Sequence, residues 1–432
     1  MTVRSLAALK RTVTAAGLML FAGMVTAQSL ESASISRGAY LARAGDCITC
    51  HTAGPEAAPF AGGLPINSPF GIIYSTNITP DPMHGIGSYT LNDFERAVRN
   101  GIARDGRRLY PAMPYPSFSS ITDPDIQALY DYFMAEVAPV DHKPPETRLP
   151  FPFNIRFSLF FWDLAFVKDE PFQPRGDRDA DWNRGAYLVQ SLGHCGACHT
   201  PRGLAFQEVA YSENSPLYLS GAVVDNWFAA NLRGDHASGL QRWPESDIVE
   251  FLKAGHSGGG TAFGSMTDVV ENSMQYLRED DLEAIAHYLK SLPARGEKSS
   301  YAPDRPDVAV KFAALKSGAV ELPGAGLYQS FCAKCHQLTG NGKAGEFPKL
   351  AGNSIVLSEN ATSLVRLLLE GSKTPETKAR LKTHEMPSFA AKFNDRQIAE
   401  VLSFIRHSWG NAASPVTARQ VASLRSALQK NP

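Results

Sequence analysis

The sequence LGHCGACHTP, residues 192–201, places two cysteines two residues apart, with a histidine directly after the second. Thiols at this spacing lie on one helical turn. Both can reach the two vinyl groups of a haem while the adjacent imidazole coordinates its iron. The same pattern occurs as CITCH at 47–51 and CAKCH at 332–336, and the three copies use all six cysteines. The chain is therefore predicted to carry three covalently bound c-type haems.

Other uses of paired cysteines fit this sequence less well. A structural zinc site needs a second pair of ligands near the first, and no such pair accompanies any of the three motifs. A thioredoxin-like redox motif does not require the histidine, and a disulfide scaffold would use cysteines outside the motifs. Haem attachment is favoured over all three. It assigns Cys47, Cys50, Cys195, Cys198, Cys332 and Cys335 to the cofactor, and His51, His199 and His336 to the iron.

Methionine is a common sixth ligand of haem iron, and the positions of the nine methionines narrow the choice. Met386 is the one methionine after the third motif. After the first motif Met83, Met113 and Met134 compete, and Met113 is preferred. Like Met386, it is followed by proline, a Ser-Phe pair and an apolar helix. Met83 comes too early, and Met134 lies on the helix itself, where a core role is more common.

The second unit departs from this pattern. Its two candidates are Met266 and Met274, and neither is followed by proline. Met274 stands four residues before Arg278, the expected start of the next helix, which leaves a short loop. Met266 is the preferred ligand, with Met274 and His256 kept as alternatives.

The predicted fold is mainly α. It comprises three tandem class I cytochrome c-type helical domains, residues 34–140, 178–293 and 320–411, joined by Pro-rich linkers. After each candidate methionine the apolar residues follow helical spacing. They are Ile126, Leu129, Tyr130 and Phe133; Leu282, Ile285, Tyr288 and Leu289; and Ile398, Val401, Leu402 and Ile405. Gly38, Gly185 and Gly326 are expected to let the first helix of each domain approach the last one closely.

Two kinds of local signal refine this picture. Thr122 with Asp125, and Asn394 with Gln397, are placed to form capping boxes at helix starts. Tyr89 and Trp243 occupy equivalent positions in the first two units. Each is expected either to hydrogen-bond a haem propionate or to pack as a core aromatic residue.

The composition is that of a globular protein, with a formal net charge of -1 and 44% hydrophobic residues. Without a basic excess, binding to nucleic acid is not favoured. Residues 1–27 join a basic start to an apolar run at 13–25 that is shorter than the ~20 residues of a spanning helix. This pattern predicts a cleaved signal peptide and export to the periplasm.

Two further segments are candidates for contacts with partners. FPFNIRFSLFFWD, residues 151–163, is too apolar for an exposed linker. It is expected to pack within the molecule or, as the alternative, to contact a partner subunit. Residues 414–432 fit an amphipathic helix capped by Ser414-Pro415, which would lie on a membrane or dock on the protein.

The sequence resembles the triheme cytochrome c subunit of membrane-bound bacterial dehydrogenases that oxidise gluconate, alcohol, sorbitol or fructose. The resemblance lies in TNITPD (76–81), GHCGACHTPRG (193–203), MTDVVENS (266–273), MPSFA (386–390) and SWGN (408–411). It implies a subunit on the outer face of the cytoplasmic membrane. Such a subunit takes electrons from a flavin or quinone-cofactor catalytic subunit, with a small third subunit in some complexes, and passes them to ubiquinone.

The residues also favour an electron carrier. If each iron has two protein ligands, no position is open for a substrate, and no nucleotide-binding fingerprint is present. No substrate chemistry of its own is therefore expected. The alternatives are a stand-alone haem enzyme of peroxidase or thiosulfate-oxidising type with one open haem, and a diffusible multi-haem carrier.

Overall fold

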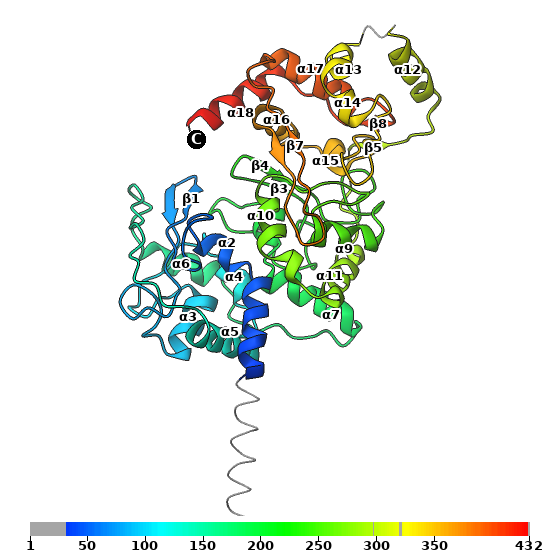
Figure 1. The fold of residues 1–432 in the computed structure, drawn as a ribbon. Coiled ribbons are helices and arrows are strands. Elements are labelled where there is room, and N and C mark those ends of the chain that lie inside the picture. The colour runs from blue at the N-terminus through cyan, green and yellow to red at the C-terminus, as the bar shows by residue number, and fades with distance from the viewer. Residues whose placement is uncertain (1–31, 297, 319–321, 431–432) are drawn as a thin grey trace, which may run out of the picture.

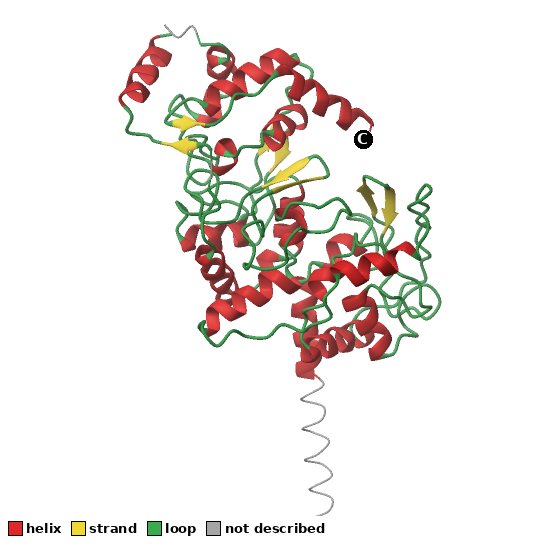
Figure 2. Ribbon diagram, turned by 180° about the vertical axis from the view of Figure 1, so that it is seen from behind, coloured by secondary structure: helices red, strands yellow, loops and turns green. Residues whose placement is uncertain are grey.

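The structure, a computed structural model, describes residues 32–296, 298–318 and 322–430. These residues are mostly helical, with short two-stranded sheets between the helices (Figures 1 and 2). The predicted signal peptide lies outside the described residues. None of the helices in the described ranges has the length and apolarity that a membrane crossing requires.

The first part of the chain surrounds the first cysteine motif. Residues 32–44 are helical and lead into α2 (Cys47–His51), which carries the motif. The antiparallel hairpin of β1 (Pro65–Ser68) and β2 (Gly71–Tyr74) follows. The remaining helices are α3 (Leu91–Asn100), α4 (Tyr115–Phe118), α5 (Asp123–Ala135) and α6 (Ser158–Phe166).

The second part repeats this order around the second motif. Helix α7 (Ala180–Tyr187) continues into the π-helical turn η1 (Leu188–Leu192), and α8 (Gly196–His199) carries the motif. The other elements are the antiparallel strands β3 (Ala222–Val224) and β4 (Trp227–Ala229), the helices α9 (Glu245–Ala254), α10 (Ser265–Asn272) and α11 (Glu279–Ser291), and the 3-10 turn η2 (Met274–Tyr276).

The third part surrounds the last motif, which lies at α14 (Ala333–His336) and the residue before it. Two antiparallel strand pairs stabilise its loops: β5 (Ser300–Tyr301) with β8 (Asn411–Ala412), and β6 (Ser372–Lys373) with β7 (Glu385–Met386). Its other helices are α12 (Pro306–Ser317), α13 (Ala325–Phe331), α15 (Ser354–Leu357), α16 (Thr362–Glu370), α17 (Asp395–Arg406) and α18 (Ala418–Lys430).

The three apolar helices predicted from periodicity are confirmed as α5, α11 and α17. Their apolar faces are buried, and Tyr130 on α5 is half-buried. Burying a large apolar side chain contributes about 1.5–3 kcal/mol, so these faces are a main source of stability.

The first two parts of the chain share one hydrophobic cluster, which runs from Leu41 to Leu292, whereas the third part has its own. Figure 1 accordingly shows the blue and green segments side by side, with the yellow-to-red segment against the green one. The Trp243 indole joins the second and third parts, because its N–H donates to Ser354 Oγ at 3.1 Å.

Reciprocal hydrogen bonds join the first and second parts. The sequence Arg-Gly-Ala-Tyr occurs at residues 37–40 and again at 184–187 in the first helix of each part. The Tyr40 hydroxyl donates to Asp281 at the start of α11. The Tyr187 hydroxyl donates to Asp125 Oδ2 at the start of α5, at 2.6 Å. The first-helix tyrosine of each part thus contacts a helix of the other part, α11 or α5, so the contact is reciprocal.

The arginines of the same repeat hold the same carboxylates from within their own part. Arg37 lies 2.5 Å from Asp125 Oδ1, and Arg184 lies 2.6 Å from Asp281 Oδ1. Both carboxylates are almost fully buried and are satisfied by an arginine and a tyrosine. A buried charge with these partners is stabilising only as a complete set, because loss of one partner leaves it uncompensated.

This arrangement explains why one predicted capping box is wrong. Thr122 is the N-cap of α5, but its side chain makes no capping hydrogen bond. Asp125, its expected partner, is held by Arg37 and Tyr187 instead. The box of Asn394 and Gln397 at α17 is confirmed.

Close helix approach is confirmed for two of the three predicted glycines. A Cβ added at Gly38 would lie 1.9 Å from the Ala128 carbonyl oxygen, and one at Gly185 would lie 2.0 Å from that of Ala284. The prediction for Gly326 is wrong, because a Cβ there would meet nothing within 4 Å. In the third part Gly324 takes this role, with a φ of 84° and the Glu400 carbonyl oxygen 2.2 Å from an added Cβ.

Gly185→Ala is expected to lower the free energy of unfolding by about 2–3 kcal/mol, because the methyl group forces α7 away from α11. Gly326→Ala serves as the matched control. It is expected to be neutral or stabilising by up to about 1 kcal/mol, since alanine favours a helix and the site is open. Chemical denaturation followed by far-UV circular dichroism measures both. Equal destabilisation of the two variants contradicts the assigned helix contact.

The C-terminal helix α18 docks on the third part. Val421 and Leu424 are buried in that part's hydrophobic cluster, and Leu428 packs against it. Arg425 pairs with Asp395 at 2.8 Å. The predicted cap at Ser414-Pro415 is wrong, because the helix begins at Ala418. At its start, Thr417 and Gln420 exchange capping hydrogen bonds.

Candidate haem sites

The histidines of the three motifs share one hydrogen-bonding arrangement, in which each Nδ1 lies against a backbone carbonyl oxygen. The pairs are His51 with Thr76 (2.6 Å), His199 with Ala230 (2.7 Å) and His336 with Pro348 (2.9 Å). A carbonyl oxygen only accepts, so each Nδ1 carries the hydrogen. Each Nε2 therefore keeps its lone pair for a metal, which is the usual way in which a ligating histidine is oriented.

The protonation state of these imidazoles also suits coordination. Desolvation lowers the pKa of His51, His199 and His336, and it outweighs the opposing effect of the carbonyl hydrogen bond in each case. The neutral imidazole is the form that binds a metal.

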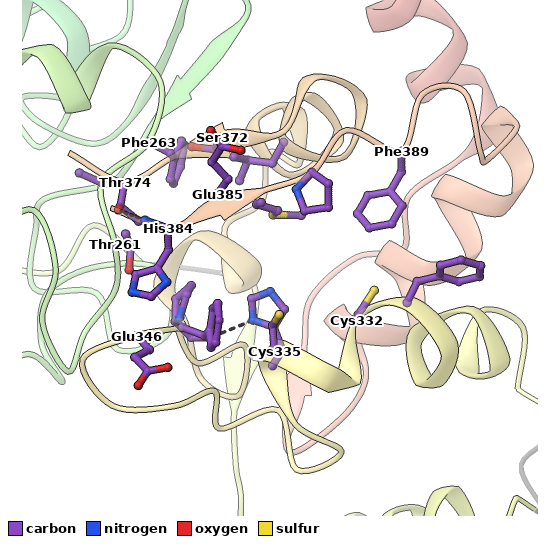
Figure 3. Close-up of a pocket in the computed structure, with 18 residues that line it drawn as sticks. Thr261, Phe263, Cys332, Cys335, Glu346, Ser372, Thr374, His384, Glu385 and Phe389 are labelled. Carbon is purple, nitrogen blue, oxygen red and sulfur yellow. Dashed lines mark hydrogen bonds between the residues drawn. The ribbon is translucent and has the colours of Figure 1, made fainter. Parts of the chain in front are cut away.

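The third motif lines an open cavity (Figure 3). Cys332, Cys335 and His336 line it from one element, and Met386 lines it from β7. Phe389 and other apolar side chains complete the walls. The cavity thus holds two thiols, an imidazole and a thioether among apolar walls. This is the donor set of a covalently attached, six-coordinate haem.

The second part of the chain contributes to the wall of the same cavity. Thr261, Ala262 and Phe263 line it, and they stand just before α10 (Figure 3). His256 is next to them, because its Nδ1 lies 2.6 Å from Thr261 Oγ1. The loop that leads to Met266 therefore touches the site of the third motif.

The first and second motifs also lie close to each other. Helix α2, which carries the first motif, packs against α10. Desolvation is the main cause that raises the pKa of the Cys50 thiol to about 12, and charge at Asp46, Cys198 and Asp268 adds to it. Cys198 belongs to the second motif, so the two motifs share one electrostatic environment.

The candidate methionines of the first part differ in burial. Met83 is 78% exposed, which removes it from any enclosed site. Met113 is partly buried against the shared hydrophobic cluster and stands two residues before α4. Met134 lies within α5 and packs against the same cluster.

The candidates of the second part differ in the same way. Met274 is 5% exposed and belongs to the hydrophobic cluster, whereas Met266 is partly buried at its edge, in the first turn of α10. His256 is hydrogen-bonded to Thr261, and burial is the first of the causes that lower its pKa to about 4. The placement favours Met266 as a ligand and Met274 as a core residue.

Comparison with known proteins decides the family. Residues 183–293 and 322–409 match the family described as cytochrome c. The chain is 48% identical over 424 residues to the cytochrome c subunit of alcohol dehydrogenase (quinone) from Gluconacetobacter polyoxogenes, covering 96% of this chain and 90% of the relative. The chain belongs to the family of dehydrogenase cytochrome c subunits.

Two other relatives support this family. The gluconate 2-dehydrogenase cytochrome c subunit of Pantoea cypripedii is 46% identical over 415 residues, covering 95% of this chain and 93% of the relative. The fructose dehydrogenase cytochrome subunit of Gluconobacter japonicus is 40% identical over 421 residues, covering 94% and 86%. Membership in the family implies covalently bound haem c.

The thiols of this cytochrome c subunit differ in pKa from those of redox-active cysteine pairs. Among the described residues, no group of three or more His, Cys, Asp or Glu side chains is placed to hold a metal ion. Desolvation raises the pKa of Cys47 and Cys195 to about 12 and that of Cys332 to about 11. Redox-active Cys-x-x-Cys pairs have lowered pKa values instead.

The two aromatic residues singled out for haem propionates have other contacts in the cytochrome c subunit. The single N–H of Trp243 is donated to Ser354, so the indole joins two parts of the chain rather than pointing a free donor at a propionate. The Tyr89 hydroxyl accepts from the backbone N–H of Arg104 at 3.3 Å and keeps its own hydrogen available.

Sequence reasoning missed several residues of these sites. Pro348 supplies the carbonyl for the third histidine, but a backbone acceptor has no side-chain signal. Thr261 and Phe263 reach the third site from another part of the chain, and only the three-dimensional packing reveals this. Asp46 precedes the first motif with a φ of 50° and accepts from Thr49 Oγ1 at 2.6 Å, which fixes the start of α2.

Proposed function

We propose that this chain is the triheme electron-transfer subunit of a periplasmic, membrane-associated dehydrogenase complex. The observation that carries the proposal is the repeated histidine arrangement: the histidine of each Cys-x-x-Cys-His motif holds its Nδ1 against a backbone carbonyl oxygen, which leaves Nε2 for a metal. Three tandem cytochrome c domains, residues 34–140, 178–293 and 320–411, would each hold one haem c.

The proposed attachment and ligand sets follow the motifs. The cysteine thiols would attach each haem covalently, and one histidine imidazole and one methionine thioether would hold its iron. The sets are Cys47, Cys50, His51 and Met113; Cys195, Cys198, His199 and Met266; and Cys332, Cys335, His336 and Met386. When bound, each haem supplies one-electron chemistry between ferrous and ferric iron. With a histidine and a methionine both holding the iron, oxygen and peroxide would find no open coordination position.

The arrangement of the sites supports a relay. The first and second motifs share an electrostatic environment, and the loop before Met266 lines the third site. Each site therefore neighbours the next in chain order. This is the arrangement expected of a chain that moves electrons between two partners rather than one that converts a substrate.

The proposed partners come from the family. The relatives are named as subunits of alcohol, gluconate 2- and fructose dehydrogenases. We propose that a catalytic subunit with a flavin or quinone cofactor donates electrons to this chain, in some complexes with a small third subunit. Ubiquinone at the outer face of the cytoplasmic membrane accepts them. Cleavage of residues 1–27 would deliver the mature chain to the periplasm.

Expression together with the proposed catalytic dehydrogenase subunit tests this proposal. The two chains are expected to purify together, and addition of the alcohol, sugar or sugar acid that the catalytic subunit oxidises should reduce all three haems in a stopped-flow experiment. A chain that purifies alone and reacts rapidly with peroxide contradicts the proposal and favours a stand-alone haem enzyme.

A further inference from the structure

The aromatic segment before and within α6 is exposed. Phe151 is 79%, Phe157 70%, Phe161 60% and Leu164 76% exposed. The expectation that residues 151–163 pack within the molecule is therefore wrong for these three phenylalanines. Large apolar side chains gathered at such exposure mark an interaction surface, because their contact with water is unfavourable.

The segment is held in place by its polar residues. Asp163 is turned inward, where Arg108 donates to it and the Tyr115 hydroxyl donates to its Oδ1 at 2.7 Å. The Trp162 indole N–H donates to the Ala205 carbonyl oxygen at 2.9 Å. Asp163 and Trp162 thus fix α6 against the protein, and its exposed apolar side chains are presented outward.

The exposed surface extends beyond α6. The Phe70 ring, in the turn between β1 and β2, lies 4.5 Å from that of Phe153 and 5.6 Å from that of Phe206. Leu204, in the loop after the second motif, is fully exposed. We define the aromatic patch as Phe151, Phe153, Phe157, Phe161, Leu164 and Leu204. It therefore joins both of the first two parts of the chain.

The chemistry of the patch favours lipid over protein. Its side chains offer no hydrogen-bond donor or acceptor, whereas a protein interface carries about one hydrogen bond per 100–200 Å². Arginines stand at its edge: Arg156 lies over the Tyr110 ring at 4.2 Å and Arg202 over the Phe206 ring at 5.6 Å. Apolar side chains bordered by cations are complementary to an anionic phospholipid surface.

We propose that the aromatic patch inserts into an anionic phospholipid bilayer and is the membrane-binding surface of this chain. The inference rests on the proposed role in a membrane-associated complex and assigns the contact to a surface. The apolar face of the C-terminal helix, the other candidate from sequence, is already covered by the third hydrophobic cluster.

Insertion of the aromatic patch would fix how the haem sites are oriented relative to the bilayer. Tyr115, which holds Asp163, stands two residues after Met113, and Ala205 stands six residues after His199. The patch therefore adjoins the first and second sites rather than the third. An acceptor dissolved in the bilayer meets these two sites first, which leaves the third site for the partner that donates electrons.

Flotation of the haem-loaded chain with phosphatidylglycerol–phosphatidylethanolamine vesicles tests the inference. The triple variant Phe157→Ser, Phe161→Ser, Leu164→Ser is expected to bind at least about tenfold more weakly, because three apolar side chains lose their transfer into lipid. The matched control is Val223→Ser, Leu322→Ser, Leu381→Ser, which alters three exposed apolar residues elsewhere. It is expected to bind as the unaltered chain does. Haem content is measured for every variant.

A second measurement needs no substitution. Amide hydrogen exchange with and without vesicles is expected to show protection concentrated at residues 151–166. Unaltered binding by the triple variant, absence of vesicle binding by the unaltered chain, or protection elsewhere overturns the proposal. A triple variant that binds vesicles normally but no longer purifies with the catalytic subunit makes the patch a protein interface instead. Failure of the electron-transfer role would appear as missing haem or missing substrate-driven reduction, and vesicle binding would be unaffected.

Discussion

Replacing Met386 with alanine is expected to open one axial position of the third haem. The thioether lines the same cavity as His336 and the two cysteines of the third motif, and its loss would remove the proposed ligand, which stabilises ferrous iron. We expect a high-spin signal from one haem in three by electron paramagnetic resonance. We also expect its potential to fall by on the order of 100 mV, within the ~0.8 V range that axial ligands span.

Met83→Ala is the matched control for this variant. Met83 is 78% exposed, so its removal is expected to leave the spectra and all three potentials unchanged. If Met386→Ala keeps three low-spin haems with unaltered potentials, the proposed ligand of the third site is wrong. If both variants change alike, the effect does not come from the axial position.

Asp281→Ala is expected to lower the free energy of unfolding by about 3 kcal/mol. The carboxylate side chain is 2% exposed and accepts hydrogen bonds from Arg184 and Tyr40, so its removal leaves a partly buried guanidinium and a partly buried tyrosine hydroxyl without their acceptor. Because Tyr40 belongs to the first part of the chain, the loss also weakens the contact between the first two parts. Denaturant unfolding followed by far-UV circular dichroism measures the change.

The neighbouring residue provides a matched control. Asp280 is 72% exposed and pairs with Arg278 at the surface, so Asp280→Ala is expected to cost less than about 1 kcal/mol. Equal losses for the two variants contradict the buried role of Asp281.

The pH dependence of the Asp281 contribution has a definite sign. Burial by itself raises the pKa of this carboxyl, but the hydrogen bonds from Arg184 and Tyr40 outweigh it and hold the pKa below its usual value. A depressed pKa in the folded state stabilises the protein above the unfolded pKa of about 3.9. The stability difference between the parent chain and Asp281→Ala should therefore be constant near neutral pH and shrink as the pH falls below about 4. A difference that stays constant down to pH 3 contradicts the assignment.

Local patterns in the sequence predicted the elements that carry the sites. The helices α5, α11 and α17 follow from apolar residues at helical spacing, because each packs one face against a core wherever that core lies. The capping box at Asn394 likewise depends only on residues three apart.

Contacts between distant segments were not predictable from these patterns. Tyr40 and Asp281 are separated by 241 residues, and nothing in either sequence context indicates the pairing. The same long-range pairing took Asp125 out of its expected capping box. Gly324 rather than Gly326 meets the last helix of the third part, because the chain enters α13 through a left-handed conformation there.

The parts of the sites that consist of a short sequence motif could be predicted from the sequence. The Cys-x-x-Cys-His pattern itself indicates haem attachment. A single methionine follows the third motif, so it is the one candidate for the sixth ligand there, and the structure places it in the cavity of that motif. The second part offers two methionines of equal chemistry. Only burial separates Met274 in the core from Met266 at its edge. The exposed face of α6 also required the structure, because an apolar run is equally compatible with burial.

The number of covalently bound haems tests the central claim most directly. Intact-mass spectrometry of the purified chain, together with pyridine haemochrome analysis, is expected to return three haem c per polypeptide, and Cys332→Ala, Cys335→Ala is expected to return two. A parent chain that carries two haems or fewer contradicts this account.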